Sequence, residues 1–189
     1  FEYGNDIIVI DMGLRFPEEN MPGIDFIIPN TAYLAERKDK IRGVLLTHGH
    51  LDHIGGIPYM IEDLGNPPLY AAPLTRGLMM KRLDEFKHLR PAEIYEVHSG
   101  ETIKLGCFEV EFFHVNHNIP DDLGVRIKTP VGTVVVTSDF KIDLTPINDK
   151  PADLDKLKRF GDEGVLLLLS DSTRAEEEGH SISESAIQK

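Results

Sequence analysis

The chain has 189 residues, of which 41% are hydrophobic, a composition typical of a globular domain with a packed core rather than of a disordered segment. Proteins that bind nucleic acid mainly through phosphate contacts are usually basic. The net charge of −12 therefore makes a nucleic-acid partner less expected but does not exclude one. No apolar run approaches the roughly 18 residues of a membrane span, and the longest, Val165–Leu169, has the length of a buried strand.

The N-terminus carries neither the basic nor the apolar segment of a secretion signal. The only cysteine, Cys107, excludes an internal disulfide and fits a reducing compartment, so we expect a cytoplasmic location and no membrane partner. Phe1 begins almost directly on a strand-like run, and a helix is expected to start within Ser181–Lys189. We therefore expect one domain that is a piece of a longer protein.

The expected elements alternate between strands and helices in the first half of the chain and become mostly strands in the second. In chain order the strands are Ile7–Asp11, Ile41–Leu46, Leu69–Ala72, Thr102–Leu105, Phe108–Val115, Gly124–Lys128, Thr133–Thr137 and Gly164–Ser170. The helices are Thr31–Lys38, Ile54–Leu64, Leu74–Phe86 and Asp153–Phe160. The residues Thr129–Gly132 have the turn chemistry of a hairpin. The pattern predicts an α/β layered domain with mixed sheets.

An informative stretch lies between the expected strand Ile41–Leu46 and the helix that follows it. Three histidines and an aspartate occur there within six residues: His48, His50, Asp52 and His53. Residues i and i+2 of an extended segment share a face, and the intervening glycine permits a tight backbone path. Imidazole and carboxylate groups suit zinc or another first-row metal. One histidine here would be better explained as part of a polar loop, but this combination predicts a metal site.

Two further candidate ligands follow strands of the second half. His117 lies just after Phe108–Val115, and Asp139 lies just after Thr133–Thr137. Either residue alone would more often be structural. Beside the first cluster, each becomes a candidate metal ligand.

The first cluster matches the HxHxDH motif of the metallo-β-lactamase superfamily, whose later histidine and bridging aspartate are matched by His117 and Asp139. The wider sequence resembles the ribonuclease J family, which belongs to the β-CASP group of that superfamily. The resembling stretches are Ile10–Pro17, Arg42–His50, Asn116–Asp121, Ser138–Asp143 and Leu169–Thr173. The resemblance implies an αββα sandwich of mixed β-sheets with flanking helices. It also implies that residues 1–189 are the N-terminal portion of a metallo-β-lactamase domain.

The same resemblance implies a ligand set for two zinc ions, with manganese or magnesium as alternatives. His48, His50 and His117 would hold the first ion, Asp52 and His53 the second, and Asp139 would bridge them. The catalytic candidates are Asp52, His53 and Asp139.

Two acidic residues are implied to support these ligands. Asp11 would orient ligands rather than bind metal, and Asp171 would bond to a ligand histidine or shape the site. The other histidines fit no ligand position of the family and are interpreted as surface or packing residues: His88, His98, His114 and His180.

The implied function is a ribonuclease that cuts phosphodiester bonds with a hydroxide activated by two zinc ions, with 5′-to-3′ exonuclease and endonuclease activity in RNA processing and decay. The partner would be RNA with a 5′-monophosphate, and the full-length protein would form a homodimer or homotetramer. The sequence has neither a Ser-His-Asp triad nor a Gly-rich phosphate-binding loop, so it suggests no nucleophile other than the hydroxide.

Three departures from the family pattern bear on these expectations. Asn118 stands where the family usually has serine, and Ser138 stands where it usually has glycine. The β-CASP domain and the later part of the metal domain, which supplies another metal-binding histidine, are absent from this chain. The isolated piece is therefore expected to be weakly active or inactive.

Two alternatives stay open. The superfamily also hydrolyses small esters, thioesters, lactones and β-lactams, and the HxHxDH motif does not separate these substrates from RNA. A metal-stabilised scaffold without turnover is the alternative from a different class.

Overall fold

The computed structural model describes residues 1–147, 149–180 and 182–187. It contains two compact units, Phe1–Val97 and His98–Lys189, and each is built around one five-stranded sheet. The two mixed sheets with helices confirm the expected fold class. That residues 1–189 form a single domain stays a prediction.

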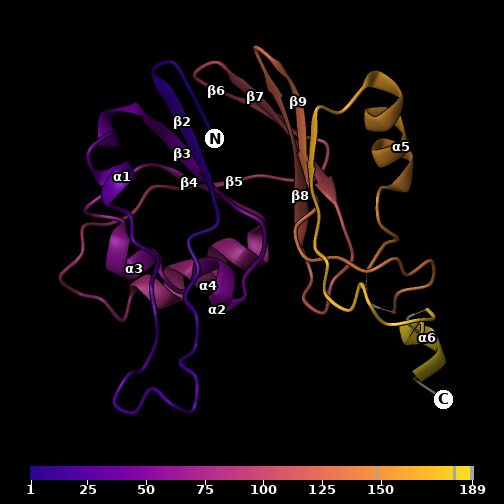
Figure 1. Ribbon diagram of the computed structural model, residues 1–189, viewed down its shortest axis with the longest axis horizontal. Helices are drawn as coiled ribbons and strands as arrows, with labels where there is room; N and C mark the ends of the chain where they lie inside the picture. Colours follow the sequence, from indigo (N-terminus) through magenta and orange to yellow (C-terminus); the bar gives the residue numbers. More distant parts are fainter. Residues whose placement is uncertain (148, 181, 188–189) are drawn as a thin grey trace. The chain divides into compact units, whose positions relative to one another are not determined.

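The sheet of the N-terminal unit is mostly parallel (Figure 1). Its strands lie in the order of the sequence: β1 (Glu2–Tyr3), β2 (Asp6–Ile10), β3 (Ile41–Leu46), β4 (Leu69–Ala71) and β5 (Ile94–Glu96). Only the β1–β2 pair is antiparallel. Because the other strands run the same way, their carboxyl ends meet at one edge of the sheet, where β2 and β3 pair through Ile10 and Leu45.

The helices of this unit are short. They are α1 (Ala32–Ala35), the 3₁₀ turn η1 (Lys38–Lys40), α2 (Leu51–Ile54), α3 (Ile57–Met60) and α4 (Pro73–Leu83). The expected helix Ile54–Leu64 is wrong, since two separate helices end at Ile54 and Met60. Gly55 and Gly56 occupy the break, and Pro58 at the second position of α3 begins a new helix more readily than it continues an old one.

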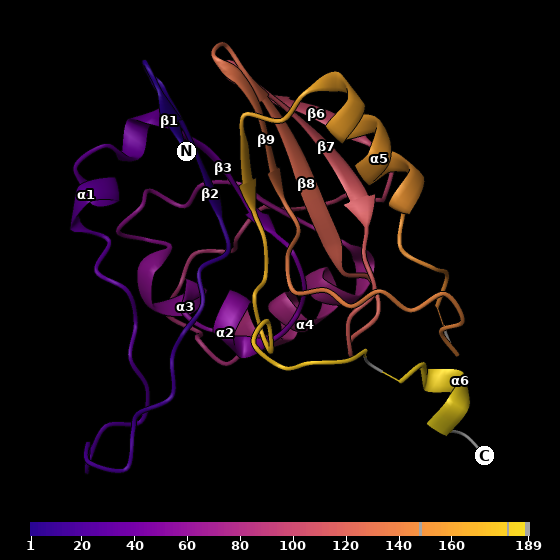
Figure 2. The ribbon, with the colours of Figure 1, turned by 45° about the vertical axis from the view of Figure 1, so that its right-hand side comes forward.

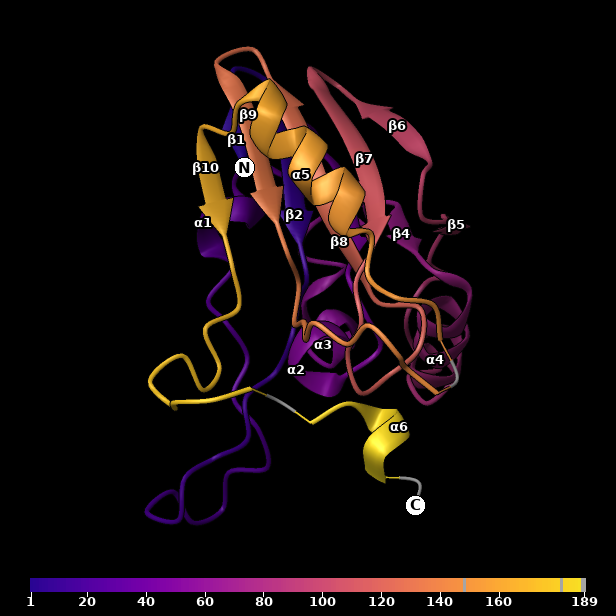
Figure 3. The same cartoon turned by 90° about the vertical axis from the view of Figure 1, so that its right-hand side faces the viewer.

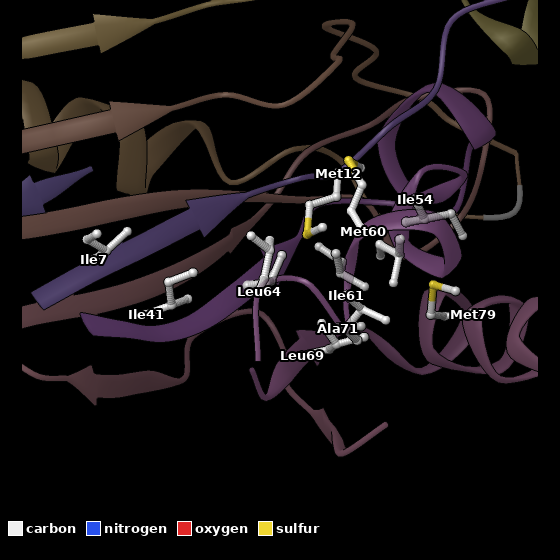
Figure 4. Close-up of a cluster of buried hydrophobic side chains, with 13 residues drawn as sticks. Ile7, Met12, Ile41, Ile54, Met60, Ile61, Leu64, Leu69, Ala71 and Met79 are labelled. Carbon is white, nitrogen blue, oxygen red and sulfur yellow. The ribbon is translucent and has the colours of Figure 1, made fainter. Parts of the chain in front are cut away.

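The core of the N-terminal unit forms where α2, α3 and α4 pack on the parallel strands (Figure 4). Its buried members include Val44, Leu46, Ile54, Ile57, Met60, Ile61, Leu69, Ala71 and Met79. Their burial fixes the end of β3 against the start of α2. That junction carries the first histidine cluster.

The C-terminal unit has a mixed sheet in the order β10-β9-β8-β7-β6 (Figure 2). Its strands are β6 (Thr102–Leu105), β7 (Phe108–His114), β8 (Leu123–Thr129), β9 (Gly132–Val136) and β10 (Leu167–Leu169). The predicted hairpin is confirmed, because Thr129 pairs with Gly132 and its hydroxyl donates to the Gly132 carbonyl at 2.8 Å. Only the β9–β10 pair is parallel.

Helix α5 (Leu154–Glu163) lies along one face of this sheet (Figure 3). Phe160 is its buried anchor, packed against Phe113, Val115 and Val135. Helix α6 (Glu184–Ile187) falls within the segment where a helix was expected to start, while Ser181, Gln188 and Lys189 lie outside the described residues.

The prediction that Val165–Leu169 is buried is wrong. Leu168 is 58% exposed, and the other four apolar residues of this run are exposed as well. β10 is the outermost strand of its sheet and, among the described residues, pairs with β9 alone. The core around Phe160 of α5 contains Phe113, Val115 and Val135 and none of these five residues, so the helix does not bury them. Among the described residues, no helix has both the length and the apolar character that crossing a membrane demands.

Candidate metal centre

The first part of the site is built at the carboxyl ends of two adjacent parallel strands. Asp11 directly follows β2, and Thr47 and His48 directly follow β3. The backbone N–H of Asp11 donates to the Leu45 carbonyl at 2.9 Å, so the two strand ends stay joined up to the first functional residue. Asp11 then takes a left-handed conformation with φ of 57°, which turns the chain sharply out of the strand.

The segment after β2 packs directly on the turn that carries the ligands. Backbone hydrogen bonds join Met12 N to the His53 carbonyl at 2.7 Å and Gly56 N to the Met12 carbonyl at 2.9 Å. A Cβ atom on Gly13 would lie 1.5 Å from the carbonyl oxygen of Asp52, an impossible overlap. Gly13 is therefore required for the close approach that fixes the backbone of Asp52 and His53.

His48 and His50 are brought together as the i, i+2 spacing predicts. His48 is fully buried, and its Nε2 atom lies 2.9 Å from Nδ1 of His50. The two rings stand edge-on to each other, with an interplanar angle of 84°. Two imidazole nitrogens thus face one point in space.

Asp52 and His53 form a second pair on the first turn of α2. His53 Nε2 lies 3.8 Å from Oδ2 of Asp52, whose side chain is 63% exposed. An exposed carboxylate beside a half-buried imidazole can serve as a ligand and still contact a substrate.

Asp11 lies behind these ligands. Its Oδ2 atom is 2.7 Å from Nδ1 of His53, on the side of the ring opposite Nε2. Its Oδ1 atom accepts from the backbone N–H of Thr47 at 2.9 Å. The carboxylate therefore orients His53, which supports the interpretation that Asp11 positions ligands.

The C-terminal unit carries the remaining pair. His117 Nε2 lies 3.7 Å from Oδ2 of Asp139. A bridge between Asn116 and Lys141 joins the two loops that carry them, with the Lys141 N–H donating to the Asn116 carbonyl at 2.8 Å. The two residues are far apart in sequence, but these loops place them side by side.

Asp171 supports the loop of Asp139. Burial raises the pKa of Asp171, but hydrogen bonds from the backbone and hydroxyl of Thr173 and from the backbone of Phe140 and Ser172 lower it overall. Phe140 directly follows Asp139, so a charged Asp171 anchors the ligand loop.

Asn116 is a structural residue that the sequence did not single out. Its buried amide donates to the Lys150 carbonyl at 2.7 Å and accepts from the Ala152 N–H at 2.8 Å. His114 is buried as well, with Nε2 3.0 Å from the Lys150 carbonyl. The two side chains hold residues 149–152 against the end of β7, three residues before His117.

The interpretation of the remaining histidines agrees with their burial. His114 is a packing residue, whereas His88, His98 and His180 are exposed. The sequence signal for Asn116 is its position directly before the candidate ligand His117.

The three donor pairs have the spacing that a metal ion needs. Two ligands of one tetrahedral zinc, each at about 2.0–2.1 Å, are roughly 3.3 Å apart. The observed separations of 2.9, 3.7 and 3.8 Å lie on either side of that value. The fold and this donor chemistry together indicate divalent-metal binding.

Comparison with known proteins agrees with the fold and with divalent-metal binding. Residues 7–181 match the model of the β-lactamase superfamily domain. The chain is 47% identical to ribonuclease J of Thermus thermophilus over all of its length and 34% of that protein. It is 43% identical to ribonuclease J 1 of Streptococcus pyogenes over 93% of its length and 31% of that protein. It therefore spans about a third of the length of these relatives.

Solved structures support the fold alone. A protein of unknown function from Enterococcus faecalis matches with a TM-score of 0.66 at 19% identity, over 97% of this chain and 48% of the other. Zinc-bound PqqB from Methylobacterium extorquens matches with a TM-score of 0.52 at 18% identity, over 75% of this chain and 52% of the other. The chain thus belongs to the β-lactamase superfamily, and its sequence corresponds to the N-terminal third of the ribonuclease J proteins.

Proposed function

We propose that this chain is the N-terminal part of the metal domain of a ribonuclease that hydrolyses RNA phosphodiester bonds at a two-metal centre. The observation that carries the proposal is the 40–47% identity to proteins named ribonuclease J, which extends over at least 93% of the chain. The same resemblance supports placing all six ligands in one centre. His48, His50 and His117 would hold one ion, Asp52 and His53 the other, and Asp139 both.

The chemistry divides between the ions and the chain. Two divalent cations would supply a hydroxide near neutral pH and offset negative charge on the phosphate oxygens. The exposed carboxylate of Asp52 would accept a hydrogen bond from the attacking hydroxide and orient it toward phosphorus. Asp11 would hold the His53 ring, and Asp171 would hold the Asp139 loop.

We propose the substrate, the cleavage mode, the assembly and the ion on the same grounds. The favoured substrate would be RNA with a 5′-monophosphate, cut both endonucleolytically and from the 5′ end, by a homodimer or homotetramer of the full-length protein in the cytoplasm. Zinc is the proposed ion, because two of the three donor pairs include an imidazole and a carboxylate and the third is two imidazoles.

The test is cleavage of 5′-monophosphorylated RNA by the full-length protein and by its Asp52→Ala variant. We expect the rate to fall by at least about 100-fold, since a group that orients the nucleophile acts on the chemical step. His88→Ala is the matched control, because His88 is an exposed histidine of the same unit outside the donor pairs.

Near-normal cleavage by Asp52→Ala would refute the assignment of Asp52. A wild-type protein that leaves RNA intact but hydrolyses a thioester or lactone would move the function to a small-molecule hydrolase. A wild-type protein that binds metal and hydrolyses neither would identify a scaffold.

A further inference from the structure

Thr47 is a buried threonine between the Asp11 carboxylate and the first metal-ligand candidate. It is 2% exposed and directly follows β3. Its Oγ1 atom lies 2.8 Å from Oδ2 of Asp11, 3.1 Å from Nδ1 of His48 and 3.5 Å from Nδ1 of His53. One hydroxyl therefore faces a carboxylate and the inner nitrogens of two histidines.

The number of protons decides the direction of each hydrogen bond. A hydroxyl has one proton to donate, and a carboxylate has none. The Thr47 hydroxyl donates its proton to Oδ2 of Asp11, so toward His48 it can only accept. Nδ1 of His48 must then carry a proton to complete the 3.1 Å contact.

The same argument applies to His53 through a different acceptor. Its Nδ1 atom faces Oδ2 of Asp11 at 2.7 Å, so this nitrogen also carries a proton. A neutral imidazole holds only one ring proton. In both rings the lone pair that a metal requires is therefore on Nε2, the atom that faces His50 in one case and Asp52 in the other.

We propose that the Thr47 hydroxyl is a positioning group that holds His48 in the Nδ1-protonated form and so makes its Nε2 atom a metal ligand. Asp11 does the same for His53, and the Thr47 N–H keeps the Asp11 carboxylate in place from its other oxygen. The consequence for metal affinity rests on the proposed function. The tautomer of His48 does not depend on it.

The test compares Thr47→Val with Thr47→Ser in the full-length protein, freed of metal by chelation and labelled with ¹⁵N-histidine. At a pH where both rings are neutral, we expect the wild type to carry the proton of each ring on Nδ1. Thr47→Val removes the hydroxyl and leaves the Asp11–His53 contact, so His48 is expected to lose its preference while His53 keeps it. Thr47→Ser retains the hydroxyl and should retain both tautomers.

Zinc affinity, measured by competition with a chromophoric chelator, gives a second readout. Loss of a group that orients a ligand typically weakens metal binding by about 10- to 100-fold, which we expect for Thr47→Val. Thr47→Ser should stay within about threefold of the wild type on the same reasoning.

Thr75→Val is the matched control. Thr75 is fully buried in α4 of the same unit, and its hydroxyl oxygen has no hydrogen-bond partner within the described ranges. The same chemical change there should alter neither tautomer and leave the zinc affinity unchanged.

Three results are decisive. A wild-type His48 ring that is protonated on Nε2 overturns the proposal without any variant, even if Thr47→Val fails to fold. A Thr47→Val protein with unchanged His48 tautomer and unchanged zinc affinity also overturns it. A wild type that binds no zinc, with His48 protonated on Nδ1, refutes the proposed metal centre and leaves the tautomer assignment standing.

Discussion

Ser138 precedes a candidate ligand in an uncommon backbone conformation. Its φ is 62°, in the left-handed region where glycine is favoured. The resemblance to the ribonuclease J family implies glycine at this position. A side chain in this region costs roughly 1 kcal/mol. The strained residue directly precedes Asp139 and so sets the direction in which the chain enters it.

We expect Ser138→Gly to raise the free energy of unfolding by up to about 1 kcal/mol, as measured by urea denaturation. Ser138→Ala is the control, since it removes the hydroxyl and keeps the Cβ atom. Equal effects of the two substitutions would show that the hydroxyl, and not the backbone, determines the cost.

At the residue scale, the sequence indicates the candidate ligands more directly than a supporting residue such as Thr47. The HxHxDH spacing indicated His48, His50, Asp52 and His53, because ligand types at short spacing are visible in one dimension. The importance of Thr47 depends on which atom donates a proton to Asp11, and no spacing records that. The side-by-side placement of His117 and Asp139 likewise depends on a bridge between distant loops.

Asp153, just before α5, ties that helix to the sheet of its unit. Burial raises its pKa, but hydrogen bonds from the His114 backbone, the Ser99 hydroxyl and the Lys156 ammonium lower it overall. A lowered folded-state pKa means that the charged form stabilises the fold. That stabilisation is complete above the unfolded pKa of about 3.9 and is lost as the pH falls through the folded value.

We expect Asp153→Asn to cost on the order of 1–2 kcal/mol at pH 7, the size of a few weakened charge-assisted hydrogen bonds. The difference from the wild type should shrink as the pH falls below about 4, because the unfolded wild type takes up a proton there, and should vanish once the pH lies below the lowered folded-state pKa of Asp153. Urea denaturation at pH 7 and pH 3 measures this. Asp155→Asn, an exposed aspartate in the first turn of α5, should have little effect at either pH.

At the element scale, the predicted boundaries agree with the structure where a segment has a clear pattern of apolar residues. The boundaries of β3 and β6 are those expected from their apolar residues. β1 and β5 were missed, since two or three mostly exposed residues leave no periodic pattern and owe their conformation to a neighbouring strand. The prediction of one helix from Ile54 was wrong because it followed the apolar spacing, whereas Gly55 and Gly56 interrupt the helix.

For the whole molecule, metal content is the direct measure of the proposed centre. We expect full-length protein purified without chelator to contain about two zinc or manganese ions per chain, the number in the two-metal centre proposed above. His117→Ala, in the C-terminal unit, should reduce this content. Exposed His98→Ala, in the same unit, should not.

Chelation should lower the thermal midpoint of the wild type, because a ligand that binds only the folded state stabilises it. Content of one ion or none in the wild type would contradict the two-metal proposal.

The exposed edge strand β10 has a consequence for the behaviour of the chain in concentrated solution. A strand with an unpaired edge and apolar side chains can add a strand from another molecule, so the association rate grows with the square of the concentration. We expect the light scattered by solutions of this chain to rise more steeply than in proportion to concentration. Leu168→Lys should suppress the scattering, while Ile182→Lys, at a still more exposed apolar site outside any strand, should not. The three residues of β10 would then limit the concentration at which the chain stays dispersed.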